Sequence, residues 1–185
     1  MLLGILGTHA VGKTTFVKSL HDNYHYRVLC ADADKLYIPG KEVVNTRKYT
    51  HSTAADKTSF LDQFVADDTQ LIIAEGCRFF AGSTMSGISN LYTTYNGGIK
   101  LFVIRTTPEV MLKCMEDRCI KRGKPFRREY WEGGNANYYA AAKFDNLIGK
   151  RAPNIPVKRF DFNGDYGFWQ KEVLPEIVKL GDWYG

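Results

Sequence analysis

One stretch near the start of the chain, GTHAVGKT at residues 7–14, has the residue types and spacing of a phosphate-binding loop. It matches G-x-x-x-x-G-K-[ST], in which the glycines let backbone N–H groups turn toward one anion. Lys13 could reach the β- and γ-phosphates of ATP, and the Thr14 hydroxyl could ligate Mg²⁺. The residues expected to bind ATP are Gly7, Thr8, His9, Ala10, Val11, Gly12, Lys13, Thr14 and Thr15.

The stretches on either side of this loop are those that a phosphate loop requires. The apolar run 2–6 predicts a buried strand, and a helix is expected from Lys13 to about Asn23, with its positive end facing the same anion. Further strands are expected over 26–31, 70–75, 99–105 and 155–162, and further helices over 53–67, 84–95, 107–123, 135–151 and 165–180, while 32–51 looks irregular. Five strands alternating with helices predict an α/β fold with a five-stranded parallel sheet flanked by helices.

Length and composition place the chain among ordinary globular proteins. It has 185 residues, of which 44% are hydrophobic and 24% charged, so one domain over 1–185 with one core is expected. The four cysteines form no C-x-x-C pair, which favours free thiols in a reducing compartment. No apolar run is long enough to span a membrane, and the N-terminus lacks the basic start of a signal peptide. We therefore expect a cytoplasmic protein without a membrane partner.

The positive charge of the chain is concentrated in one segment. Between Lys113 and Arg128 there are seven basic and two acidic residues. Arg118 and Arg122 are four residues apart and share a helix face, and Arg127 follows just after the Gly123 turn. Guanidinium groups bind phosphate oxygens in a bidentate way, although such a charge run can also be a solvated helix face.

Several classes of P-loop protein do not fit. The chain has no N/TKxD guanine motif and no LSGGQ-like stretch, and it is short for a helicase or motor. The phosphate loop, together with T-P-E at 107–109 and R-x-x-x-R-G at 118–123, resembles the P-loop kinases of nucleosides, nucleoside monophosphates and polynucleotide ends. The likeness covers about residues 1–35 and 70–128. It implies the kinase type of P-loop NTPase fold, with an arginine-rich helical lid over about 108–134.

The resemblance also implies roles for individual residues. Arg118 and Arg122 would stabilise the charge of the transferring phosphoryl group, while Arg127 and Arg128 would bind substrate. In kinases of nucleic-acid hydroxyls, an aspartate after the second strand resembles the general base. Asp34 is the preferred base here and Asp32 the alternative, with Asp32 otherwise a substrate-binding residue.

A second carboxylate could serve as base or lie beside Mg²⁺. Glu75 ends the apolar strand LIIAE, where a Walker-B-type acid would stand, and Arg78 three residues later could bind the acceptor. The chain reads Glu-Gly-Cys-Arg where deoxynucleoside kinases carry Glu-Arg-Ser and thymidylate kinases Asp-Arg, so both roles stay open. In similar kinases the loop after the fifth strand, here 163–166, touches the adenine.

Together these features predict a kinase that uses ATP and Mg²⁺. The acceptor is expected to be a hydroxyl of a nucleotide or nucleic acid, because aromatic residues are interleaved with basic ones near the acceptor side. Two specific forms are a viral-type kinase of 5-hydroxymethyl pyrimidine in DNA and a polynucleotide 5′-hydroxyl kinase. The alternatives are a nucleoside or nucleoside monophosphate (thymidylate-like) kinase, a small-metabolite kinase and a nucleotide-gated, non-catalytic binding module.

Overall fold

The computed structural model describes residues 1–30, 35–37, 44–45, 71–76, 98–132, 148–150 and 153–181, with 35–37 and 44–45 as backbone only. The helices expected over 53–67 and 84–95, and most of the one expected over 135–151, lie outside these residues. Within them, no helix combines the length and the apolar character that crossing a lipid bilayer would need.

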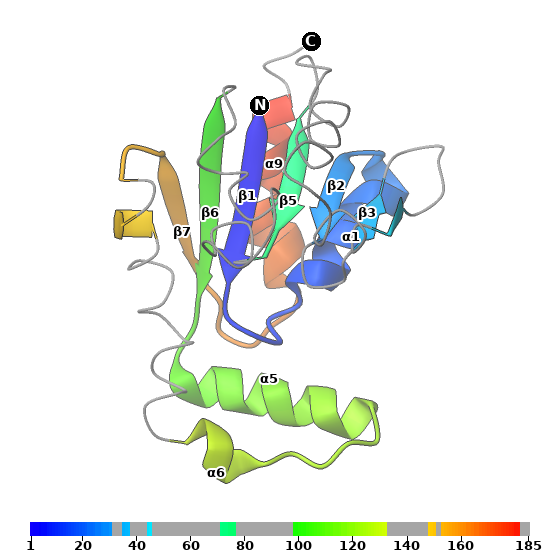
Figure 1. The fold of residues 1–185 in the computed structure, drawn as a ribbon, viewed down its shortest axis with the longest axis vertical. Coiled ribbons are helices and arrows are strands. Elements are labelled where there is room, and N and C mark those ends of the chain that lie inside the picture. The colour runs from blue at the N-terminus through cyan, green and yellow to red at the C-terminus, as the bar shows by residue number, and fades with distance from the viewer. Residues whose placement is uncertain are drawn as a thin grey trace, which may run out of the picture.

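A single sheet with the strand order β4-β3-β2-β5-β1-β6-β7 forms the centre of the molecule (Figure 1). Its five mutually parallel strands are β1 (Leu2–Gly7), β2 (Arg27–Cys30), β5 (Ile72–Glu75), β6 (Ile99–Arg105) and β7 (Val157–Asp161). The five-stranded parallel sheet predicted from the apolar runs is thereby confirmed.

Two further strands, β3 (Lys35–Tyr37) and β4 (Val44–Asn45), extend the β2 edge in antiparallel fashion. The expectation of purely irregular structure over 32–51 was therefore wrong. Strands of three and two residues are too short to produce a periodic apolar pattern.

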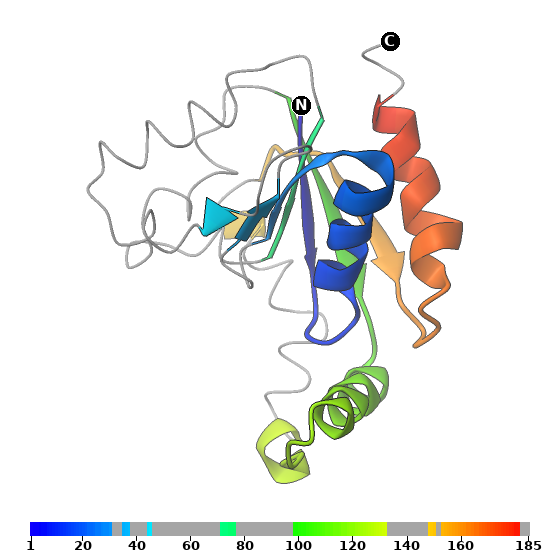
Figure 2. The same cartoon turned by 90° about the vertical axis from the view of Figure 1, so that its right-hand side faces the viewer.

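Two helical elements cover one face of the parallel strands (Figure 2). The first is α1 (Lys13–Tyr24), which buries Phe16, Val17 and Leu20 as its periodicity predicts. The second is formed by a π-helical segment, η4 (Trp169–Val173), which continues into α9 (Leu174–Gly181). It begins a few residues later than the predicted start at 165, because residues 163–167 form a turn.

A helix follows β6 and projects beyond the carboxyl ends of the strands (Figure 1). This helix, α5 (Pro108–Lys121), starts where the sequence indicates, since the Thr107 hydroxyl accepts a hydrogen bond from the Val110 amide at 3.3 Å. Gly123 has φ +61° just after it, the left-handed conformation expected of a residue that ends a helix. A four-residue helix, α6 (Arg128–Trp131), packs beside α5.

Candidate functional site: the phosphate loop and the strand ends

The phosphate loop connects β1 to α1 and contains two left-handed residues. Ala10 has φ +62° and Gly12 has φ +93°, and Gly12 is also the residue that caps α1. Gly12 adopts this φ without steric cost, whereas Ala10 is in a region that non-glycine residues rarely occupy. The loop therefore has a fixed, locally strained shape that other contacts must maintain.

Gly7 is required by a close approach of two strands. It pairs with Ile104 of β6, and a Cβ atom on Gly7 would stand 2.8 Å from both the Cβ atom and the carbonyl oxygen of Ile104. Any larger residue would push β1 and β6 apart where the loop begins.

Lys13 is held inside the loop. Its side chain is only 7% exposed, and Nζ donates a hydrogen bond of 2.7 Å to the carbonyl oxygen of Thr8. Thr8 is itself fully buried, and its hydroxyl has no hydrogen-bond partner among the described residues. A buried ammonium and a spare buried hydroxyl, beside the N-terminus of α1, fit an anion such as a phosphate group.

Thr14 lies beside Glu75 although 61 residues separate them. The Thr14 hydroxyl donates a hydrogen bond of 2.9 Å to Oε1 of Glu75, which is fully buried at the carboxyl end of β5. β5 is adjacent to β1 in the sheet, and this neighbourhood brings the two side chains together. A hydroxyl and a carboxylate are the oxygen ligands that Mg²⁺ prefers.

This oxygen pair fits a magnesium ion that also binds phosphate. Among the described residues no group of three or more His, Cys, Asp or Glu could hold a metal. Mg²⁺ usually takes one or two protein ligands and completes its shell with water and substrate phosphates. The hydroxyl oxygen of Thr14 and the carboxylate of Glu75 match that pattern as two metal ligands.

Two aromatic residues after β7 contact the phosphate loop. Tyr166 belongs to the turn that was expected to touch the adenine, whereas Trp169 was not assigned to the site. The Tyr166 hydroxyl donates a hydrogen bond of 3.2 Å to the carbonyl oxygen of Ala10. Trp169 Nε1 donates one of 2.8 Å to the carbonyl oxygen of Val11. Such contacts across more than 150 positions have no local sequence pattern, and position 166 stood out only as part of the turn that follows β7.

The turn that carries Tyr166 is ordered by its own side chains. The Asp165 amide donates to Asn163 Oδ1 at 2.9 Å, and the Gly167 amide donates to Asp165 Oδ1 at 2.8 Å. The hydrogen bond from Gly167 and the nearby Lys171 ammonium hold the pKa of Asp165 below its usual value. The predicted contact of this loop with adenine remains a prediction.

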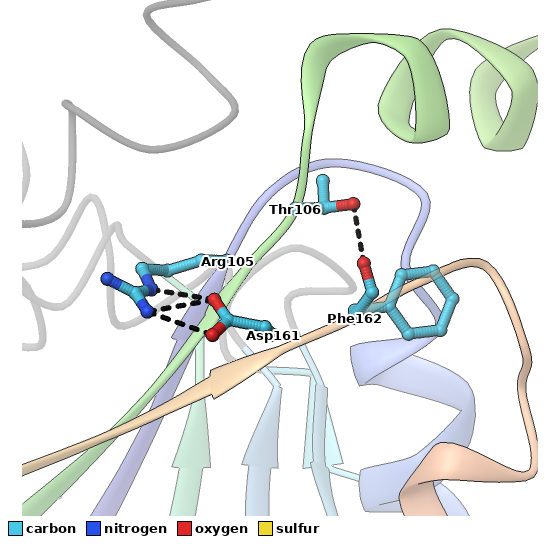
Figure 3. Close-up of polar contacts among 4 residues, drawn as sticks. All are labelled: Arg105, Thr106, Asp161 and Phe162. Atoms are coloured by element: carbon cyan, nitrogen blue, oxygen red, sulfur yellow. Dashed lines mark hydrogen bonds and ion pairs between the residues drawn. The ribbon is translucent and has the colours of Figure 1, made fainter.

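The carboxyl ends of β6 and β7 are joined by polar contacts (Figure 3). Arg105 donates two hydrogen bonds of 3.0 Å to the two carboxylate oxygens of Asp161. Thr106 donates one of 2.8 Å to the carbonyl oxygen of Phe162. These contacts fix the place from which α5 and the turn at 163–167 leave the sheet.

The segment expected to form the lid lies at this same edge. Arg118, Arg122, Arg127 and Arg128 are all exposed to solvent. Arg128 is paired with Glu132, which raises the pKa of its guanidinium.

Arg118 is the arginine that the electrostatics connect to the phosphate loop. Partial burial and a hydrogen bond with Cys114 raise the pKa of Tyr166 to about 12, and the charge of Arg118 opposes this shift. Tyr166 is thus close to α5 on one side and to Ala10 of the loop on the other.

The end of α6 also reaches the loop. The ring of Trp131 meets the ring of His9 edge-on, with 6.0 Å between the ring centres. The segment 108–132 thus contacts the phosphate loop through Trp131, while its role as a lid remains a prediction.

Three of the predicted site residues cannot be placed. Asp32, Asp34 and Arg78 lie outside the described residues, so the predicted base and acceptor contact remain predictions. Of the others, the structure brings together Lys13, Thr14 and Glu75.

No protein-family model matches the sequence, and no curated protein sequence resembles it significantly. Solved structures do resemble the fold. A gluconokinase from Sinorhizobium meliloti 1021 has a TM-score of 0.51 at 13% identity, over 97% of this chain and 93% of that one. The deoxyadenosine kinase from M. mycoides, with the products dCMP and dCDP bound, has a TM-score of 0.50 at 14% identity, over 97% and 100%.

A sulfotransferase from Alicyclobacillus acidocaldarius has a TM-score of 0.55 at 11% identity, over 99% of this chain and 80% of that one. At these identities the likeness concerns the fold and not the substrate. It shows that the chain shares the overall α/β fold of these two kinases and of the sulfotransferase.

Proposed function

We propose that the chain is a kinase that uses ATP and Mg²⁺ and transfers the γ-phosphoryl group of ATP to a hydroxyl of a nucleotide or nucleic acid. The observation that carries this proposal is the hydrogen bond between Thr14 and the buried Glu75. It combines the hydroxyl of the phosphate-loop motif with an acid at the end of the neighbouring strand, beside the enclosed Lys13.

In this proposal the residues of the loop bind and orient the polyphosphate of ATP. Backbone amides of residues 7–15 and the Lys13 ammonium bind the phosphates, while Thr14 and Glu75 hold Mg²⁺ directly or through its water. Bound Mg²⁺ would neutralise charge on the phosphate oxygens. Lys13 and the helix dipole of α1 would counter the negative charge that remains.

Phosphoryl transfer breaks the bond between the γ-phosphorus and its bridging oxygen and forms one to the acceptor oxygen. The acceptor hydroxyl loses its proton to a carboxylate late in the transfer. Because Glu75 accepts a hydrogen bond from Thr14, we assign Glu75 to Mg²⁺ and not to the acceptor hydroxyl. This assignment supports Asp34 as the base, with Asp32 as the alternative.

Arg118 is the lid arginine that we assign to the transferring group, with Arg122 as its neighbour one turn along the helix. Its charge acts on Tyr166, whose hydroxyl contacts the phosphate loop. Arg127 and Arg128 stand farther along the segment and are assigned to the acceptor. Closing this segment over ATP would exclude water, which would otherwise hydrolyse it.

The proposed class of acceptor is argued from the positive charge of the segment between Lys113 and Arg128. Every basic residue between Lys113 and Arg128 is exposed, which supports an acceptor that carries phosphate. A 5-hydroxymethyl pyrimidine in DNA and a polynucleotide 5′-hydroxyl are the specific forms, and a nucleoside or nucleoside monophosphate is the nearest alternative. The free thiols of Cys114 and Cys119 fit the cytoplasm as the compartment.

The test is a screen for acceptors that stimulate ATP consumption. Nucleosides, nucleoside monophosphates, DNA with and without hydroxymethyl pyrimidines, and small hydroxy acids are offered in parallel. The proposal expects a nucleotide or DNA acceptor to raise turnover, and a DNA acceptor to bind more weakly as salt increases.

Two results would contradict the proposal. The first is that no acceptor raises turnover above background hydrolysis. The second is that a group is transferred from a sulfuryl donor and not from ATP. Stimulation by small hydroxy acids alone would support kinase activity but contradict the proposal that the acceptor is a nucleotide or nucleic acid. For the base, Asp34→Asn should lower the rate and spare ATP binding, whereas a selective effect of Asp32→Asn would move the role to Asp32.

A further inference from the structure

Two hydrogen bonds attach the phosphate loop to the segment that follows β7. Their donors are the Trp169 indole and the Tyr166 hydroxyl, and their acceptors are the carbonyl oxygens of Val11 and Ala10, at 2.8 and 3.2 Å. The acceptors belong to consecutive peptide groups in the centre of the loop.

The direction of these carbonyls determines the direction of the following amides. No peptide bond among the described residues is cis, and in a planar trans peptide the C=O and N–H groups point in opposite directions. The N–H groups of Val11 and Gly12 therefore point away from Tyr166 and Trp169. A loop that binds an anion needs its amides on one side and its carbonyls on the other, because carbonyl oxygens repel phosphate.

The indole is itself firmly held. Trp169 is 4% exposed, and its ring stacks on Phe16 of α1 with 4.7 Å between centres and 25° between planes. A Cβ atom placed on Gly12 would lie 3.1 Å from Nε1 of Trp169 and 3.2 Å from two ring carbons of Tyr166. Both rings thus rest directly against the backbone of Gly12, one of the two left-handed residues of the loop.

We propose that Trp169 and Tyr166 are positioning residues for the phosphate loop. They hold the carbonyls of Ala10 and Val11 outward, so that the next two amides face the polyphosphate of the nucleotide. This role rests on the proposed function, since it concerns the same loop.

The experiment measures binding of three probes to the full-length protein by calorimetry: ATP, inorganic tripolyphosphate and adenosine. Trp169→Phe keeps a ring on Phe16 but removes the donor, and Tyr166→Phe removes only the hydroxyl. Each variant should bind ATP and tripolyphosphate about tenfold more weakly, equal to about 1.4 kcal/mol. Adenosine affinity should not change, because adenosine has no phosphate. In the acceptor assay, the KM for ATP should rise more than kcat falls.

Phe160→Leu provides the matched control, since it shrinks a buried ring of β7 that contacts Phe102 and Phe168 but no loop carbonyl. It should lower the melting temperature and leave tripolyphosphate affinity unchanged. If Trp169→Phe fails to fold, Tyr166→Phe gives the same comparison, because Tyr166 is 45% exposed.

The outcomes separate the two proposals. Folded Trp169 and Tyr166 variants that bind tripolyphosphate as the wild type does would overturn the positioning role alone. An equal loss of adenosine affinity in these variants would also overturn the positioning role. So would an equal loss of tripolyphosphate affinity in Phe160→Leu. A wild-type protein that binds neither ATP nor tripolyphosphate would overturn the proposed function and this role with it.

Discussion

Replacing Gly7 by alanine tests the packing that supports the phosphate loop. Gly7 is the last residue of β1, and its φ lies outside the left-handed region, so alanine is conformationally acceptable there. The obstacle is steric. The new Cβ atom would stand 2.8 Å from the Cβ atom and from the carbonyl oxygen of Ile104, its partner in β6.

Both contacts are shorter than real Cβ atoms tolerate, and one is to a backbone atom that moves only if β6 moves. Overpacking of this kind costs about 1–3 kcal/mol. For a chain of this size, each kcal/mol lowers the melting temperature by about 2–4 °C, so the expected decrease is about 2–12 °C. Because the loop begins at Gly7, the affinity for ATP should fall as well.

The assay is thermal unfolding followed by circular dichroism, with Gly98→Ala as the matched control. Gly98 precedes the same strand, β6, and a Cβ atom placed on it would meet no atom within 4 Å. The control should melt close to the wild type. If Gly7→Ala and Gly98→Ala melt at the same temperature, the close approach of β1 and β6 at this point is refuted.

Glu176 accepts ion pairs of 2.5 Å from Lys158 and 2.6 Å from Lys179, which lower its pKa to about 2. Because this pKa is below that of the unfolded chain, the stabilisation is present above about pH 4.5 and is lost as the pH falls toward 2. Glu176→Gln should cost about 1 kcal/mol or less at pH 7, and melting curves of the two proteins should converge near pH 2; a constant gap would contradict this. Thr107→Ala removes the N-cap of α5 and should cost about 0.5–2 kcal/mol in denaturant unfolding, whereas Thr107→Ser should not. Arg118→Ala should lower turnover on the order of 10³-fold, with Arg118→Lys only partly active, and a loss below about tenfold would remove Arg118 from the catalytic group.

Much of the framework could be predicted from local patterns. The parallel strands follow apolar runs, and α5 starts at a Thr-Pro-Glu sequence and ends before Gly123, as capping preferences predict. The phosphate loop is a contiguous motif, so its residues were identified directly. The rule that parallel strands bring their carboxyl ends to one edge also predicts that Glu75 lies near the loop.

The contacts that depend on tertiary packing could not be predicted in this way. The hydrogen bond between Thr14 and Glu75 requires that β5 be adjacent to β1, which no local pattern specifies. Trp169 and Tyr166 act through single side-chain donors on distant carbonyls, and an aromatic residue near a helix start suggests core packing first.

The central claim is that the loop at 7–15 binds the polyphosphate of ATP through Lys13. The most direct measurement is calorimetric titration of ATP, with Mg²⁺ present, into the wild type, Lys13→Ala and Lys179→Ala. Lys179 is an exposed lysine on α9 whose partner is Glu176, so its removal is the same chemical change away from the loop. The account predicts that wild type and Lys179→Ala bind ATP alike, while Lys13→Ala folds and binds at least about tenfold more weakly. Equal affinity for ATP in all three proteins would contradict it.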